Sequence, residues 1–316
     1  MNVYTKEPTV ESSSTKFGFY PKYLDIKTNF FSVITIPEYE SVISDIKAHP
    51  NVDKDWFYAG PQEVSDLYGN VSTKPYSGRV FSMPKTHILK LNGAFSQKDL
   101  NFVIWCLSFF TGMRLTTTQA GFLDATPIKP GTLVDFCVSD SSEQNAIQVA
   151  LNYLRKENHH HLECTRIAAV IHALFLAQRP QNLNYEKFQY LYMSLDGCFS
   201  IMWDRRDKKL KHNKPNHALR VRWMCEKFEM QPPFWADGED SIAPIRNDNF
   251  HEAIFFDHPI GFSAYGTERS RSKHGNILLQ IEALICRFLV AILGINDANY
   301  ISSNLNSRAC HLLKIR

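Results

Sequence analysis

The chain has 316 residues, which is more than one typical domain and suits two domains with separate cores. Hydrophobic residues make up 44% of the chain and charged residues 21%, a composition that excludes a disordered protein. The formal net charge is only +3, so overall charge predicts no nucleic-acid or membrane partner, and such a surface would need a local basic patch.

The first half of the chain predicts a mixed domain. Residues 1–27 are polar and are expected to form a flexible lead-in. Short β-branched and aromatic runs follow, such as Phe31–Ile36 and His87–Leu91, and the Gly, Pro and Asn residues between them are typical of strands and turns. One apolar helix is expected between a capping box that begins at Ser96 and a stop at Gly112. A β-containing domain over residues 28–140 is therefore predicted.

From residue 141 the apolar residues take helical spacing. Four helices are predicted over residues 162–177, 185–203, 216–230 and 277–293. A further helix is predicted to begin between residues 241 and 244 and to run to residue 256. Short links between them indicate an antiparallel bundle. The last helix is interrupted by Gln280, Glu282 and Arg287, so we expect it in a core and not in a membrane. The predicted fold class is α+β, with a mixed N-terminal domain and an all-α bundle over residues 141–316.

The cysteines predict reduced thiols in a cytoplasmic protein. They are odd in number, no two form a C-x-x-C pair, and most lie in apolar stretches, which argues against a disulfide framework and a thiolate zinc site. The start of the chain also lacks the pattern of a signal peptide. The seven positions are Cys106, Cys137, Cys164, Cys198, Cys225, Cys286 and Cys310.

One segment, Ile242–Ile254, carries the candidate catalytic residues. Asn247 and His251 are four positions apart and share a helix face, while the longer side chain of Arg246 can reach back to them. A guanidinium binds phosphate through two hydrogen bonds, and a histidine with an ordinary pKa of about 6.5 exchanges protons near neutrality. Because Pro244 is tolerated only in a first turn, the helix should begin just upstream, where its N-terminus favours an anion.

This segment resembles the signature of the HEPN family: an arginine, a polar residue, and a histidine after four to six intervening residues in all, on a late helix of a small bundle. Other Arg and His residues in the chain have similar spacing, but only Arg246 and His251 combine it with Asn247 and this helical context. The resemblance covers about residues 141–293. A weaker similarity at Leu107–Met113 is to the Apea-like group, in which a β-containing domain precedes the bundle.

The resemblance implies an endoribonuclease that uses neither metal nor cofactor. In such enzymes the RNA 2′-hydroxyl attacks the adjacent phosphate and leaves a cyclic phosphate and a 5′-hydroxyl. Arg246, Asn247 and His251 would be the catalytic residues, at a composite site of a homodimer. Similar proteins act in bacterial defence against phage or as toxins, with the N-terminal domain as a sensor for a protein or ligand trigger. The alternative is a non-catalytic HEPN protein that binds RNA, nucleotide or a partner protein.

Further residues are weaker candidates. The run Arg205–Arg222 holds eight Lys or Arg against one acid, and either contacts RNA phosphates or forms a solvated loop. The candidate RNA-binding residues are Arg205, Arg206, Lys208, Lys209, Lys211 and Lys214. Asp196 and Glu252 either orient the catalytic residues or lie in surface ion pairs. The adjacent residues His159–His161 point in different directions on a helix, so no metal site is expected there.

Overall fold

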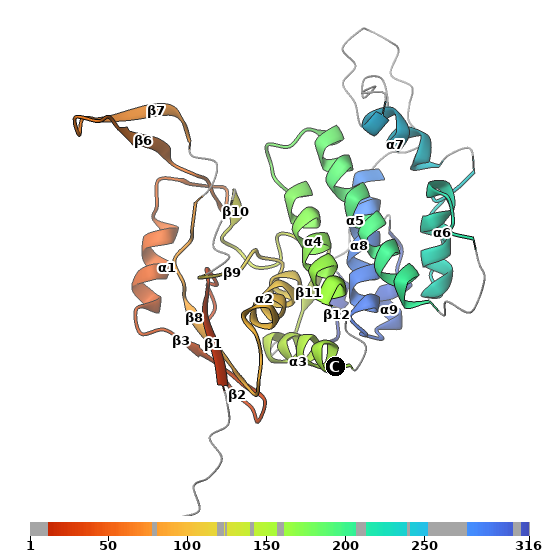
Figure 1. Ribbon diagram of the computed structural model, residues 1–316, viewed down its shortest axis with the longest axis horizontal. Coiled ribbons are helices and arrows are strands. Elements are labelled where there is room, and N and C mark those ends of the chain that lie inside the picture. The colour runs from red at the N-terminus through yellow and green to blue at the C-terminus, as the bar shows by residue number, and fades with distance from the viewer. Residues whose placement is uncertain are drawn as a thin grey trace, which may run out of the picture. The chain divides into compact units, whose positions relative to one another are not determined.

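The computed structural model describes residues 12–77, 81–118, 123, 125–139, 142–156, 161–206, 213–238, 241–251, 277–305 and 311–315. Within these residues the chain forms both helices and antiparallel strands, as the sequence predicts (Figure 1). The chain divides into two compact units, of which the first comprises residues 1–108 and 113–132 and the second residues 109–112 and 133–316. The division therefore falls a few residues before the predicted boundary at 140.

The first unit is built on an antiparallel sheet with the strand order β2-β3-β8-β1-β9. Alternate residues of its strands are buried, and Phe31 and Val33 lie opposite Leu91 and Leu89. The five strands are β1 Ser12–Gly18, β2 Asp25–Lys27, β3 Phe31–Thr35, β8 His87–Asn92 and β9 Thr116–Thr117. The prediction of a flexible lead-in is therefore wrong for residues 12–18 and 25–27, because β1 and β2 both pair in the sheet.

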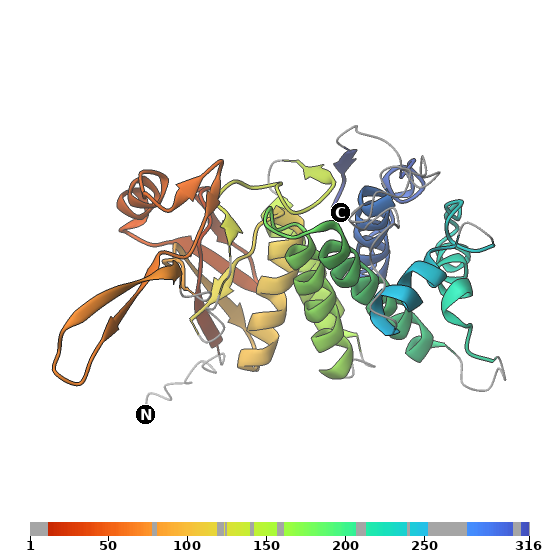
Figure 2. The ribbon, with the colours of Figure 1, turned by 90° about the horizontal axis from the view of Figure 1, so that it is seen from above.

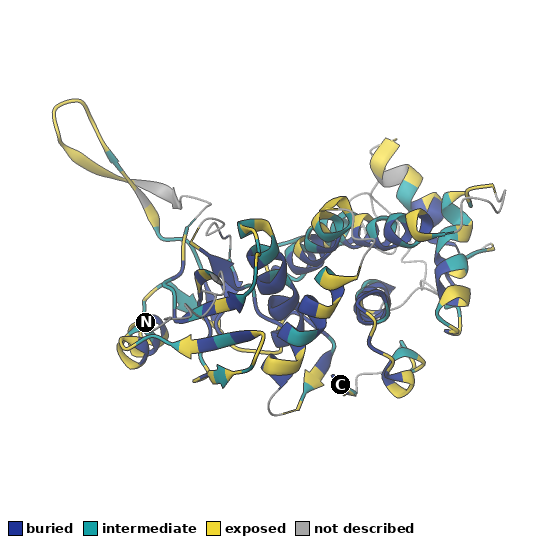
Figure 3. Cartoon of the chain, turned by 60° about the horizontal axis from the view of Figure 1, so that its bottom comes forward, coloured by how far each residue is buried: buried dark blue, intermediate teal, exposed yellow. Residues whose placement is uncertain are grey.

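Smaller elements complete the first unit. Ser96 and Asp99 form the predicted capping box, since the Asp99 carboxylate accepts from the Ser96 N–H at 2.8 Å and the Ser96 hydroxyl accepts from the Asp99 N–H at 3.3 Å. The β6–β7 hairpin is largely exposed (Figure 3). The elements are α1 Tyr39–Lys47, β4 Val52–Asp53, β5 Trp56–Phe57, β6 Pro61–Ser65, β7 Val71–Ser77, α2 Gln97–Thr111 and β10 Thr126–Pro127.

The second unit is mainly helical (Figures 1 and 2). The predicted helices are present, within a few residues at each described end, and α3 and α9 are additional. The prediction of an all-α bundle is wrong in one respect, because the unit also contains two strands, β11 and β12, which pair in parallel. Its elements are β11 Phe136–Val138, α3 Ser142–Arg155, α4 His161–Ala177, α5 Asn184–Arg205, α6 His217–Lys227, α7 Ile242–His251, α8 Ile277–Ile292, α9 Ala298–Ile301 and β12 His311–Leu313.

The core of the second unit lies where α4, α5 and α8 pack together. The apolar residues at helical spacing in α5, such as Phe188, Leu195 and Phe199, are buried, and α8 is buried along most of its length. Gly197 allows close packing of α5 on α4, because a Cβ atom at this position would lie only 2.4 Å from a methyl group of Val170. These helices form the base on which α6 and α7 are placed.

A buried ionic network joins α8 to the elements around it. Arg287 is 1% exposed, and its Nη1 donates to the carboxylate of Asp135 at 2.6 Å and to the carbonyl of Ala283 at 2.7 Å. Its Nη2 donates to the Ser303 hydroxyl at 2.7 Å, and the hydroxyl of Tyr300 donates to Asp135 at 2.6 Å. The network neutralises a charge that would otherwise be very costly to bury.

The cysteines follow the prediction in part. Cys106, Cys198, Cys225 and Cys286 are buried free thiols, as expected. Cys137 is disulfide-bonded, so the prediction of reduced thiols is wrong at this position, where the side chain lies exposed on β11. Among the described helices, none combines the length and the apolar character that a membrane span requires.

Candidate active site

The helix α7 begins where Pro244 predicts, and its apolar residues fix it to the bundle. The Ser241 hydroxyl accepts from the N–H of Ala243 at 3.2 Å, and the carbonyl of Trp235 accepts from the N–H of Ile242 at 3.2 Å. Ile242 and Ile245 are buried, so the polar residues that follow lie on the more exposed side of the helix. α7 is therefore held from its apolar face.

The structure brings the three predicted catalytic residues into contact. Nη1 of Arg246 donates to Oδ1 of Asn247 at 3.0 Å and lies 2.5 Å from Nε2 of His251. Because a guanidinium can only donate, Nε2 of His251 carries a lone pair in this arrangement. Asn247 and His251 are exposed and Arg246 is half-buried, so the group is open to a solvent-borne ligand.

Aromatic rings flank the guanidinium of Arg246. Its Cζ lies 5.5 Å from the centre of the Phe250 ring and 6.0 Å from that of Tyr192, within the range of a cation–π contact. The two rings are themselves 6.3 Å apart. Tyr192 is buried on α5, so the contact connects α7 to the bundle core.

The helices α5 and α6 add further polar groups beside Arg246. The Tyr192 hydroxyl lies 3.4 Å from Nδ1 of His217. Asp196 pairs with Arg220 at 2.8 Å, and its other carboxylate oxygen lies 3.5 Å from the same Nδ1. Arg220 Nη1 lies 3.0 Å from the same Nδ1. We use the name Arg246 cluster for Tyr192, Asp196, His217, Arg220, Arg246, Asn247 and His251.

Burial and neighbouring charges set the protonation of two members of the cluster. Burial and the nearby Asp196 raise the pKa of Tyr192 to about 12, although Arg246 and Arg220 act in the opposite direction. Burial lowers the pKa of His217, and Arg220 and Arg246 add to this effect while Asp196 opposes it. His217 is therefore neutral at pH 7. Since Arg220 donates to its Nδ1, the proton of the neutral ring lies on Nε2.

The described side chains of the cluster carry excess positive charge. Arg220 and Arg246 are balanced by Asp196 alone, and the exposed Lys214 lies near enough to lower the pKa of His217. Guanidinium groups bind phosphate oxygens through paired hydrogen bonds. The arrangement can therefore bind a phosphate, with a histidine lone pair and a neutral imidazole N–H beside it.

The weaker predicted residues have different outcomes. Asp196 is part of the cluster. Arg205 instead forms an ion pair with Glu163 on α4 and donates to the carbonyl of Ile292 at 3.3 Å, which is a structural role within the bundle. Arg206 stacks on Trp203, with its Cζ 3.7 Å from the ring centre. Lys208, Lys209, Lys211 and Glu252 lie outside the described residues.

Three residues of the Arg246 cluster were not predicted from the sequence: Tyr192, His217 and Arg220. Tyr192 is a buried residue of α5, where an aromatic side chain at helical spacing indicates a core position. The available signal was spacing, because Tyr192 and Asp196 are four positions apart and His217 and Arg220 are three apart, so that each pair shares a helix face. Spacing alone does not show that these two helix faces lie beside α7, because that contact depends on tertiary packing.

No family model matches this sequence, and neither a curated protein nor a solved structure matches it. Within the described part of the chain, no group of three or more His, Cys, Asp or Glu side chains is placed to hold a metal ion.

Proposed function

We propose that the second unit is a metal-independent, HEPN-type endoribonuclease that cleaves RNA by attack of the 2′-hydroxyl on the adjacent phosphate. The observation that carries the proposal is the contact of Arg246 with both Asn247 and His251, beside a second guanidinium and a second histidine from α6. The resemblance of the Arg246–His251 segment to the HEPN signature supports the same assignment. RNA is the substrate because the reaction requires a 2′-hydroxyl.

Arg246 binds the phosphate in this proposal. A phosphate oxygen that accepts from the guanidinium replaces Nε2 of His251 as its acceptor, so the histidine lone pair is released when the substrate binds. Arg220 and Lys214 add positive charge on the same side, and Asn247 holds the guanidinium in position. Binding of the substrate phosphate to Arg246 thus also makes His251 available as the general base.

His251 then takes the proton of the 2′-hydroxyl, and the 2′-oxygen forms a bond to phosphorus. The bond from phosphorus to the 5′-oxygen breaks, which leaves a cyclic phosphate on one product. His217 donates a hydrogen bond from Nε2 to a phosphate oxygen and keeps its proton, since its lowered pKa suits a neutral donor. The departing 5′-oxygen leaves on the opposite side of phosphorus, where it takes a proton from a second protonated His251.

That second histidine comes from another copy of the chain. We expect the protein to sediment as a homodimer at tens of micromolar without RNA, with the two α7 helices near the two-fold axis, as the family resemblance implies. Sedimentation equilibrium measures this directly. A monomer under these conditions would contradict the composite site, because only one His251 would then be available for the reaction.

Cleavage of RNA by the purified protein in EDTA tests the proposal. Activity should survive chelation because the assigned steps use protein side chains. Arg246→Lys keeps the charge but loses the paired hydrogen bonds, so the rate should fall about 10- to 100-fold. The matched control is Arg222→Lys on α6, an exposed arginine that pairs with Asp237 outside the Arg246 cluster, and it should cleave as the parent does. If no RNA is cut between about pH 6 and pH 9, the catalytic assignment is wrong and a binding protein remains.

A further inference from the structure

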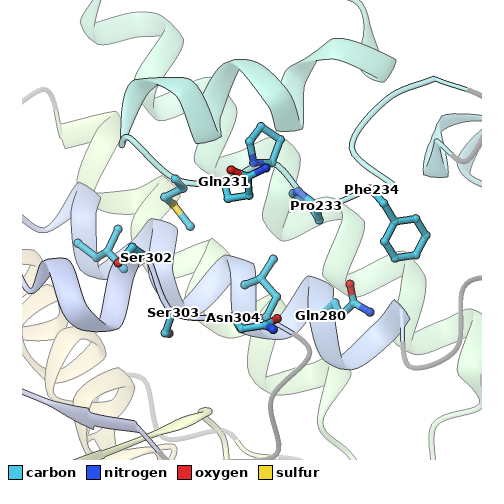
Figure 4. A pocket seen from close by; sticks show the side chains of 11 residues that line it. Gln231, Pro233, Phe234, Gln280, Ser302, Ser303 and Asn304 are labelled. Carbon is cyan, nitrogen blue, oxygen red and sulfur yellow. The ribbon is translucent and has the colours of Figure 1, made fainter.

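The second unit contains a cavity of about 410 Å³ that the Arg246 cluster does not use (Figure 4). One wall is the segment from Met230 to Phe234, which follows α6. The opposite wall is formed by Gln280 of α8 and by residues 301–305. Its volume lies within the range of small-molecule sites, which is about 300–1,000 Å³.

The lining of this cavity predicts a neutral ligand. None of its 11 lining residues ionises near neutral pH. Pro232, Pro233 and Phe234 offer flat apolar surfaces, and Gln231 and Ser302 offer donors and acceptors of hydrogen bonds. A planar heterocycle with polar edges satisfies both kinds of surface. Proteins bind unpaired bases in this way, by stacking on a ring and by hydrogen bonds to the base edge.

One amide of the cavity has a fixed orientation. The indole N–H of the buried Trp235 donates to Oε1 of Gln280 at 2.9 Å. Because the indole can only donate, the oxygen of this amide faces Trp235 and its NH₂ group is left as the donor. A ligand that contacts this NH₂ group must therefore present an acceptor, such as a ring nitrogen or a carbonyl oxygen of a base.

The cavity is also connected to the catalytic helix through the backbone. Trp235 directly follows Phe234, and its carbonyl accepts from the N–H of Ile242, the first residue of α7. The loop that forms one wall therefore joins α6 to α7, the two helices that supply His217 and Arg246. A ligand in the cavity contacts the same loop that positions the proposed site.

We infer that this cavity binds a nucleobase. The inference rests on the proposed function for its biological source, which is an unpaired base of the RNA that the Arg246 cluster cleaves. A free nucleoside has the same recognition chemistry and would act on α7 through the loop. The two sources are distinguished by experiment.

Equilibrium dialysis of the full chain with adenosine, guanosine, cytidine and uridine tests the cavity independently of cleavage. At least one nucleoside should bind, and Phe234→Ala should weaken its binding about 5- to 100-fold through loss of stacking. Phe234 is 49% exposed, so this change should leave the fold intact. Phe30→Ala, at a phenylalanine 44% exposed in the first unit, is the matched control and should bind as the parent does.

The outcomes separate the two proposals. If Phe234→Ala changes which bases flank the cleavage sites in RNA, the bound base belongs to the substrate. If Phe234→Ala weakens nucleoside binding and the cleavage sites stay the same, the cavity takes a free ligand, and the nucleobase assignment still holds. Nucleoside binding that Phe234→Ala leaves unchanged, with unchanged cleavage sites, overturns the assignment to this cavity. Binding without any RNA cleavage overturns the proposed function alone. Absence of binding by all four nucleosides, together with unchanged cleavage sites, overturns the nucleobase assignment even if His251 is required for cleavage.

Discussion

His251→Ala is expected to reduce the rate of RNA cleavage about 10²- to 10⁴-fold, which is the usual contribution of general acid–base catalysis. The physical reason is that Nε2 of His251 already accepts a hydrogen bond from Arg246 and is released when phosphate binds. Alanine removes the lone pair and leaves the guanidinium in place. The measurement is the single-turnover rate on a labelled RNA.

The matched control is His161→Ala, at an exposed histidine in the first turn of α4. It removes an imidazole of the same size away from the Arg246 cluster and should leave the rate unchanged. Asn247→Ala should fall between the parent and His251→Ala, because this amide only positions the guanidinium. Thermal unfolding of each variant must match the parent. Cleavage by His251→Ala at the parental rate would exclude the proposed role of this residue.

Arg287→Met is expected to destabilise the second unit by about 3–5 kcal/mol, because it leaves the carboxylate of Asp135 without its cation in a partly buried site. For a unit of this size, the loss corresponds to a fall in Tm of roughly 6–20 °C. Thermal denaturation followed by circular dichroism measures the change. The Ser303 hydroxyl also loses its donor, so the effect extends to the end of α9.

A second variant identifies the cause of this destabilisation. Asp135→Asn combined with Arg287→Met removes both charges and should recover part of the lost stability, since an unpaired buried charge is more costly than a missing pair. Arg166→Ala is the surface control. Its partner Asp204 is well exposed, so the loss should stay below about 1 kcal/mol. Equal destabilisation by Arg287→Met and Arg166→Ala would show that the network has no special contribution.

The helices of the second unit were predictable because their apolar residues repeat at helical spacing over long stretches. The buried stripe of α5, from Phe188 to Phe199, is a clear case. The strand β1 was missed because Ser12–Lys16 is polar, and its place in the sheet depends on pairing with β8 and not on its own composition. The strand β2 was missed because it has only three residues. The helix α1 was missed although Tyr39 and Ile43 are four positions apart, because it is short.

The candidate site was predictable to the extent that it lies on one helix. Arg246, Asn247 and His251 are close in sequence, so helical geometry alone places them within reach of one another. His217 and Arg220 lie about thirty positions earlier, and only the packing of α6 beside α5 and α7 brings them to the same place. The cavity beside Phe234 was not predictable for the same reason, since its walls come from three separate segments.

The parallel pairing of β11 with β12 has a consequence for how the second unit is made. The side chain of Asn145 on α3 donates to the carbonyl of Ile315, across 170 positions of sequence. During synthesis the helices between these ends emerge first and have only local partners, while contacts of such long separation form late and slowly. Because β12 follows all the helices of the unit in sequence, β11 lacks its partner strand until residues 311–313 have been synthesised.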